Sequence, residues 1–371
     1  MSRYFLFGTL VWDSLLADVA GRAVDIVPAT LSGWRVERAA AGDWPVLVEG
    51  GRCEGGLTGD LPEDAKARLD WYETAFGYVP DAVQVAGPDG PVAALVYREA
   101  APSGGSGEAW SLDDWIARHG ERTRLAAAEV MRGHGRVAPQ GIAARRGVIH
   151  ARAQGIVTAR RTRRPATVGG EHDATEVAVH RVDYPYEGFH RVEEWHLDHP
   201  RFDGTRSERM QRAISHVTDA ATVLPWDPAR DRVLVVEQIR IGALAKGDPL
   251  PWMLEPVAGL IDAGETPTTT ALREMEEEAG LTVAPDALHF VGRYYPSPGG
   301  LAQVINSYVA LCDLPNGSDG LHGLDEEHED IRAHLVPRAD LMAMVASGEA
   351  ANAPLIVSAL WLAHHAERLR G

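Results

Sequence analysis

Three glutamates in the C-terminal half of the chain have the types and spacing of a metal site. Glu274 and Glu278 lie four residues apart, and Glu277 lies between them. Positions four apart share one face of an α-helix, so these like-charged carboxylates repel one another unless a cation lies among them. Arg273 is the one basic residue beside them. Because hard carboxylate oxygens without Cys or His favour Mg²⁺ or Mn²⁺ over zinc, the pattern indicates a magnesium or manganese site.

The residues around the glutamates predict the helix that positions them. Thr266 is a good N-cap, Pro267 stands where a helix tolerates proline, and Gly280 is a natural stop. The residues between them are mostly helix formers. A solvated acidic helix face is the usual interpretation of a run of glutamates. The longer pattern around this run argues against that interpretation.

Residues 259–281 match the pattern G-x5-E-x7-R-E-U-x-E-E-x-G-U at every position, with U an aliphatic residue. This is the Nudix box, and the C-terminal half of the chain therefore resembles the Nudix hydrolases. The resemblance implies an α/β/α sandwich with a mixed sheet. It also implies metal-assisted attack of water on a nucleoside diphosphate that is linked to another group. Arg273 and Glu265 are expected to brace the box as an ion pair.

From about residue 180 to the end, the flanking stretches resemble the ADP-ribose pyrophosphatase branch of that family. They are YEGF at 186–189, AATVLPWDP at 220–228, VEQIR at 236–240, PWMLEPVAG at 251–259, SPGG at 297–300 and EHEDIR at 327–332. The branch implies hydrolysis of ADP-ribose to AMP and ribose 5-phosphate, or of a related nucleoside diphosphate sugar. It also implies a homodimer in which the strands before the box cross to the partner.

This resemblance gives the acidic residues their expected roles. The expected metal ligands are the carboxylates of Glu274, Glu278 and Glu329 and the backbone carbonyl of Ala258. Glu277 would be a further ligand or a direct neighbour of the ligands. Glu327 would be the catalytic base that activates water, since a carboxylate on a loop can take a proton after the substrate binds. Without the box, the acidic loop at 325–330 would be interpreted as solvated charge.

The same resemblance assigns the substrate-binding residues. Phe189 would stack on adenine, and Arg212 and Arg240 would hold the diphosphate or the terminal ribose. Two alternatives stay open, because Phe189 could belong to a hydrophobic core and Arg212 to a surface salt bridge. Gln303 stands where this branch commonly has a glutamate. A neutral amide there removes a charge near the substrate, which leaves another ADP-sugar open as the substrate.

The first hundred residues predict a different fold. Residues 4–12 are strand-like, 62–75 form an amphipathic helix, and 78–98 form a hairpin. The motifs FGTL at 7–10 and LDWYE at 69–73, the latter followed by Gly77 and Tyr78, resemble the γ-glutamylcyclotransferase-like family. That family implies a small β-barrel with helices.

By the same resemblance, Glu73 would be the acid/base of a γ-glutamylamine cyclotransferase. Phe7 and Thr9 depart from the Tyr and Ser usual in this family, and Pro80 stands near a common Arg. These departures weaken the prediction of activity more than the prediction of fold. Two alternatives stay open: Glu73 as an exposed helix carboxylate, and the domain as a non-catalytic binding or assembly module.

The sequence therefore predicts a protein of two domains, mixed α+β and α/β in class. We expect a cyclotransferase-like domain at 1–135, a linker rich in Arg, Gly and Ala at 136–172, and a Nudix domain at 173–371. The arginines of the linker could bind nucleic acid, neutralise the acidic domains or be solvated beside one helix. The last interpretation fits best, because the whole chain is acidic.

Composition supports these expectations. The 371 residues include 53 acidic and 36 basic ones, for a net charge of −17, which argues against a general nucleic-acid binder. An anionic small molecule would then need local arginines and a metal ion. The two cysteines lie far apart, which favours a reduced, cytoplasmic setting. We expect no membrane span, because no apolar run approaches about 18 residues.

Overall fold

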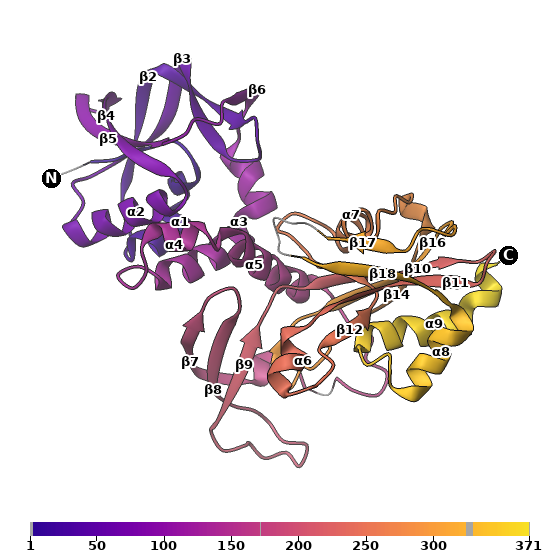
Figure 1. Cartoon of the computed structure of the whole chain (residues 1–371). Coiled ribbons are helices and arrows are strands. Elements are labelled where there is room, and N and C mark those ends of the chain that lie inside the picture. The colour runs from indigo at the N-terminus through magenta and orange to yellow at the C-terminus, as the bar shows by residue number, and fades with distance from the viewer. Residues whose placement is uncertain (1–2, 171, 324–328, 371) are drawn as a thin grey trace. The chain divides into compact units, whose positions relative to one another are not determined.

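The computed structural model describes residues 3–170, 172–323 and 329–370. The chain folds into two compact units, residues 1–162 and 163–371. Each unit combines helices with β-sheet (Figure 1), so the fold is mixed α and β with two domains. Among the described residues, we find no helix that is both long and apolar enough to cross a bilayer.

The first unit combines an antiparallel sheet with helices. Its elements are β1 (Phe5–Leu6), α1 (Asp13–Ala20), β2 (Ile26–Ala39), β3 (Pro45–Thr58), α2 (Glu63–Ala75), β4 (Tyr78–Gly87), β5 (Gly90–Glu99), β6 (Gly105–Ala109), α3 (Leu112–Arg132), α4 (Pro139–Ala143) and α5 (Arg146–Arg161). The helix predicted at 62–75 and the hairpin predicted at 78–98 are both present, as α2 and as β4 paired with β5.

The strands of this unit run in the order β1-β3-β2-β4-β5, and β6 pairs with β2. One isolated bridge, between Tyr4 and Leu95, links the two ends of this path. Because β1 is only two residues long, it forms no longer ladder with β5. The described strands therefore do not form the closed small barrel that the cyclotransferase-like resemblance implied.

Helices α2, α3 and α5 pack together over a common core. Leu69 of α2, Val130 of α3 and Ile149 of α5 are all buried in it. Arg152 of α5 is also buried, and its guanidinium lies 2.5 Å from the carboxylate of Glu129 on α3. Helix α5 falls in the range where the sequence indicates a linker, yet its buried contacts belong to the first unit.

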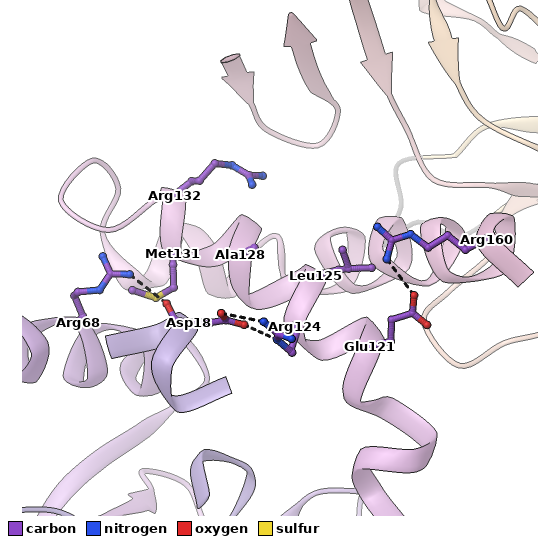
Figure 2. Close-up of a pocket in the computed structure, with 9 residues that line it drawn as sticks. All are labelled: Asp18, Arg68, Glu121, Arg124, Leu125, Ala128, Met131, Arg132 and Arg160. Atoms are coloured by element: carbon purple, nitrogen blue, oxygen red, sulfur yellow. Dashed lines mark hydrogen bonds and ion pairs between the residues drawn. The ribbon is translucent and has the colours of Figure 1, made fainter. Parts of the chain in front are cut away.

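These helices also line a cavity of about 550 Å³ (Figure 2). Arg124 donates to Asp18 at 2.7 Å, and Arg160 donates to Glu121 at 3.1 Å, so two ion pairs lie in its wall. The lining residues are Asp18, Arg68, Glu121, Arg124, Leu125, Ala128, Met131, Arg132 and Arg160. None of these described residues belongs to the site that the sequence predicts.

The second unit contains two sheets and four helices among its described residues. Its elements are β7 (Ala178–Glu187), β8 (Arg191–Asp198), β9 (Met210–His216), β10 (Ala220–Asp227), β11 (Arg232–Ile239), α6 (Ile241–Lys246), β12 (Trp252–Glu255), β13 (Val257–Leu260), α7 (Pro267–Ala279), β14 (Leu288–Tyr294), β15 (Leu301–Ala302), β16 (Ile305–Leu311), β17 (Gly320–His322), β18 (Ile331–Pro337), α8 (Arg338–Ser347) and α9 (Ala353–Leu369).

The larger sheet has the order β14-β16-β10-β11-β18-β17, and β12 and β13 pair in addition with its central strands β11 and β10. It is mixed, because β10 and β16 are parallel and the other pairs are antiparallel. Alternate residues of a strand face opposite sides. Leu234 therefore packs with Met275 of α7, whereas Val235 packs with Leu362 of α9. Helices cover both faces of this sheet, α7 on one and α8 with α9 on the other (Figure 1).

Candidate active site

Glu274 and Glu278 lie on α7, as the box predicts, and both side chains are largely buried. Burial raises the pKa of Glu274 to about 7 and that of Glu278 to about 8. The negative charge of Glu329 raises both pKa values further, which places Glu329 within electrostatic range of the pair. The structure thus brings together three of the carboxylates that were expected to bind metal.

Strand β13 holds the two glutamates from the other side. The backbone N–H of Ala258 donates to Oε2 of Glu278 at 2.9 Å, and Nε2 of Gln238 lies 3.4 Å from the other oxygen. A Cβ added to Gly259 would lie 1.7 Å from Oε1 of Glu274. Only glycine therefore lets this carboxylate lie against the strand. Gly259, the first residue of the box, thus lies against Glu274, and the backbone of Ala258 lies against Glu278.

Arg273 connects the carboxylates of the box. Its guanidinium lies 3.0 Å from Glu265, 2.6 Å from Glu274 and 2.8 Å from Glu277. The predicted ion pair with Glu265 is confirmed. Burial alone would raise the pKa of Glu265, but hydrogen bonds from Arg273 and Thr270 lower it below its usual value. One guanidinium thus serves three carboxylates, whereas Glu278 has no hydrogen bond from it.

The donor set fits a hard divalent cation. Burial and mutual repulsion disfavour the charged forms of Glu274 and Glu278, and a divalent ion between them would reverse this effect. Oxygen ligands without nitrogen or sulfur suit Mg²⁺ or Mn²⁺. The residues that could hold the ion are Glu274, Glu278 and Glu329, with the carbonyl of Ala258 beside them.

A second acidic group lies on the smaller sheet. Asp183, Glu194 and His196 have ligand atoms within 4.8 Å of one another. These atoms already have other partners, because Arg181 lies 2.8 Å from Asp183 and Gln211 donates to Glu194 at 2.8 Å. The group therefore resembles a hydrogen-bonded surface network more than a metal site.

The predicted substrate residues lie on two different sheets. Arg240 follows β11 and is close enough to Glu278 to lower its pKa, so it belongs to the glutamate site. Phe189 lies between β7 and β8 of the smaller sheet and is 57% exposed, which excludes a place in the core of this chain. Arg212 of β9 is exposed and donates to the carbonyl of Gln211. Neither contacts the glutamates in the described part of the chain.

Two further predicted residues complete the comparison. Gln303 follows β15, and its Nε2 donates to the carbonyl of Thr218 at 2.8 Å. Glu327, the expected base, lies outside the described residues. Two residues that the sequence did not single out also lie beside Arg240: Glu255 accepts a hydrogen bond from Arg240, and Asn352 donates one to Glu255. Glu255 lies within the quoted stretch at 251–259, whereas no motif includes Asn352.

Glu73 lies on α2 in the first unit and is partly buried, so it is not an exposed helix carboxylate. Burial raises its pKa to about 8. Its carboxylate has no hydrogen bond or ion pair with any other described residue. By contrast, the nearby Asp70 accepts hydrogen bonds from Tyr4 and Tyr97, both at 2.8 Å. The first unit thus holds a carboxyl group whose pKa is raised by burial and which no described side chain binds.

Comparisons with known proteins agree with the geometry of the second unit. The ADP-ribose pyrophosphatase of Escherichia coli strain K12 is 38% identical over 203 residues, which cover 54% of this chain and 93% of that protein. This chain belongs to the Nudix family. The NUDIX domain model matches residues 216–357, and the catalytic unit is therefore a Nudix hydrolase domain.

Other matches cover both parts of this Nudix protein. The ADP-ribose pyrophosphatase of Haemophilus influenzae is 36% identical over 179 residues, which are 48% of this chain and 81% of that protein. The GDP-mannose pyrophosphatase of Cronobacter sakazakii is 28% identical over 160 residues, or 42% of this chain and 81% of that protein. The family model "Gamma-glutamyl cyclotransferase, AIG2-like" matches residues 4–117. The first unit thus carries a cyclotransferase-like domain.

Proposed function

We propose that the Nudix unit hydrolyses the diphosphate of ADP-ribose to give AMP and ribose 5-phosphate. The observation that carries this proposal is the buried pair Glu274 and Glu278, held against β13 at Gly259 and repelling each other in a site of oxygen ligands. The similarity to two ADP-ribose pyrophosphatases supports the choice of substrate. A related nucleoside diphosphate sugar is the alternative, since a GDP-mannose pyrophosphatase is also similar.

Each group of residues has a part in this reaction. Bound Mg²⁺ would lower the pKa of a coordinated water and offset charge on the diphosphate. Arg240 would bind the diphosphate through its guanidinium. Glu327 would take the proton of the attacking water. The water oxygen bonds to one phosphorus, the bond from that phosphorus to the bridging oxygen breaks, and the bridging oxygen leaves with the other phosphate. Phe189 and Arg212 would contact the adenine and the ribose.

The test is turnover of a substrate panel by the full chain with Mg²⁺ and a coupling phosphatase. ADP-ribose, ADP-glucose, NADH, diadenosine polyphosphates and GDP-mannose are compared, with Glu278→Gln as the control variant. We expect preference for ADP-ribose and a large loss in the variant. Preference for another member of the panel would refute the substrate. Unchanged turnover in Glu278→Gln would refute the site.

We also propose that the Nudix unit works as a homodimer. Ile241, Leu250 and Trp252 are large apolar side chains, and all three are exposed on and beside α6. Large apolar side chains that gather on a surface mark sites of association. Light scattering should give twice the mass of 40.1 kDa. Trp252→Ser should shift this mass toward the single chain, and a monomeric wild type would refute the proposal.

A second activity is favoured by one observation in the first unit, the partly buried and unpaired Glu73. In a γ-glutamyl amine, the α-amino nitrogen would attack the γ-carbonyl carbon, and the bond from that carbon to the leaving amine would break. Glu73 would carry the proton from the attacking nitrogen to the leaving nitrogen. Release of 5-oxoproline that is lost in Glu73→Gln would support this activity. An inactive wild type across a γ-glutamyl panel would favour a binding or assembly module.

A further inference from the structure

A buried carboxylate connects the substrate site to the C-terminal helix. Glu255 ends β12, and its side chain is only 6% exposed. One of its oxygens, Oε2, accepts from Nε of Arg240 at 2.7 Å and lies 2.5 Å from the Nη2 nitrogen. The other oxygen, Oε1, accepts from Nδ2 of Asn352 at 2.7 Å. Both oxygens of this buried group are therefore satisfied by side chains.

Asn352 is fixed in turn by the helix that it begins. It is the N-cap of α9, and its Oδ1 accepts from the backbone N–H of Leu355 at 3.1 Å. The oxygen of its side-chain amide thus binds the helix backbone, and the nitrogen binds Glu255. Leu355 is itself buried against the larger sheet, so this end of α9 has a fixed position. The orientation of Glu255 therefore depends on a residue 97 positions later in the chain.

Glu255 and Arg240 both lie at the glutamate site. Glu255 of β12 pairs with Val236 of β11. Gln238 lies two positions after Val236 on the same strand, and its Nε2 is 3.4 Å from Oε1 of Glu278. Arg240 lowers the pKa of Glu278, so its charge lies within range of the carboxylates. Arginine has a long, mobile side chain that loses conformational entropy when it binds an anion. A buried anchor such as Glu255 reduces this loss, because the side chain is already fixed. The anchor thus aims the guanidinium before substrate arrives.

We propose that Glu255 and Asn352 are positioning residues that hold Arg240 for the substrate diphosphate. This proposal rests on the proposed function of the Nudix unit. The start of α9 thereby becomes part of the support of the substrate site, since Asn352 acts on Arg240 through Glu255. Arg240 is the binding residue, Glu255 sets its direction, and Asn352 sets the direction of Glu255.

Asn352→Ser is the most informative variant. Serine remains a good N-cap, so α9 keeps its capping bond, but its short side chain cannot donate to Glu255. We expect KM for ADP-ribose to rise about tenfold while kcat changes by less than about threefold, because a looser Arg240 weakens binding in ground and transition states alike. Damage to the fold would instead lower kcat through a smaller active fraction, with KM unchanged. Asn352→Ala should raise KM equally and also lower the melting temperature.

A double-mutant cycle shows whether the effect passes through Arg240. Arg240→Ala alone should raise KM at least as much as Asn352→Ser. In the Arg240→Ala background, Asn352→Ser should change KM by less than about twofold, because its target is gone. A full tenfold rise in that background would overturn the proposal, and so would an unchanged KM in Asn352→Ser beside an impaired Arg240→Ala. If Arg240→Ala binds ADP-ribose as well as wild type does, Arg240 is not the binding residue and this inference fails. If wild type does not hydrolyse ADP-ribose, the proposed function fails, and the inference fails with it.

Discussion

Gly259 is the position where the smallest change tests the geometry of the Nudix site. A Cβ built there would lie 1.7 Å from Oε1 and 2.0 Å from Cδ of Glu274. Real Cβ contacts are essentially never shorter than 3.0 Å, so the carboxylate must move by at least 1.3 Å, which is 3.0 minus 1.7. Gly259 lies in β13 without a positive φ, so its backbone suits alanine. Displacement of Glu274 is therefore the main effect of Gly259→Ala.

A displacement of about 1 Å at a reacting centre lowers the rate about 100-fold. We expect Gly259→Ala to lower kcat by that order and to raise the Mg²⁺ concentration needed for half of full activity. The assay is phosphate release from ADP-ribose across a Mg²⁺ series. Gly292→Ala is the matched control, because a Cβ on that β14 residue meets no atom within 4 Å. It should keep kcat within about twofold of wild type.

The loss must also depend on Glu274. Glu274→Ala should be impaired to a similar extent, and adding Gly259→Ala to it should cause little further loss. Thermal melting of each variant shows whether the unit still folds. If Gly259→Ala keeps its Mg²⁺ requirement and a kcat within about threefold of wild type, then Glu274 does not act where the structure places it.

Three further predictions concern stability. The folded chain holds a proton on Glu73 up to a pKa of about 8, whereas the unfolded chain loses it near 4.5, so the first unit loses stability as pH rises between these values. In calorimetric melts, Glu73→Gln should no longer lose stability over this pH range. If its melting temperature fell with pH as that of wild type does, the prediction would be contradicted. Arg273→Ala leaves three carboxylates without their shared guanidinium, so the second unit should melt earlier in EDTA and regain most of the difference with Mg²⁺; equal losses in both conditions would argue against a metal ion there. Thr266→Ala removes the hydrogen bond to the N–H of Thr269 and should lower the free energy of unfolding by about 1 kcal/mol in urea, which Thr266→Ser should restore.

The sequence predicted those parts of the site that depend on nearby residues. Thr266 caps α7, and Gly280 ends it with a left-handed backbone, as expected. The ion pair of Arg273 with Glu265 spans eight residues and was also predicted. Capping, helical spacing and short-range charge pairing act within a few turns of chain, so a single sequence carries their signals.

The parts that were missed depend on contacts between distant segments. The linker interpretation of 136–172 rested on composition, and composition does not show that Arg152 meets Glu129 in a buried ion pair. Closure of the barrel depends on how β1 meets β5, and β1 is too short for a pattern to report this. The bond from Asn352 to Glu255 spans 97 residues, and each residue alone looks ordinary. Tertiary contacts decide these features.

Gln303 shows how such a contact explains a departure from the expected pattern. The sequence indicated only that an amide replaces the usual glutamate near the substrate. In the structure its Nε2 donates to the carbonyl of Thr218, and Thr218 is buried. An ionised carboxylate has no proton to donate, so glutamate in this conformation would place negative charge against a carbonyl oxygen. The adjacent Asp219 is partly buried, which raises its pKa, and it accepts from the N–H of Val304, so a second carboxylate beside it would also be repelled. The amide is therefore the residue that suits this conformation, because it can donate to the carbonyl of Thr218.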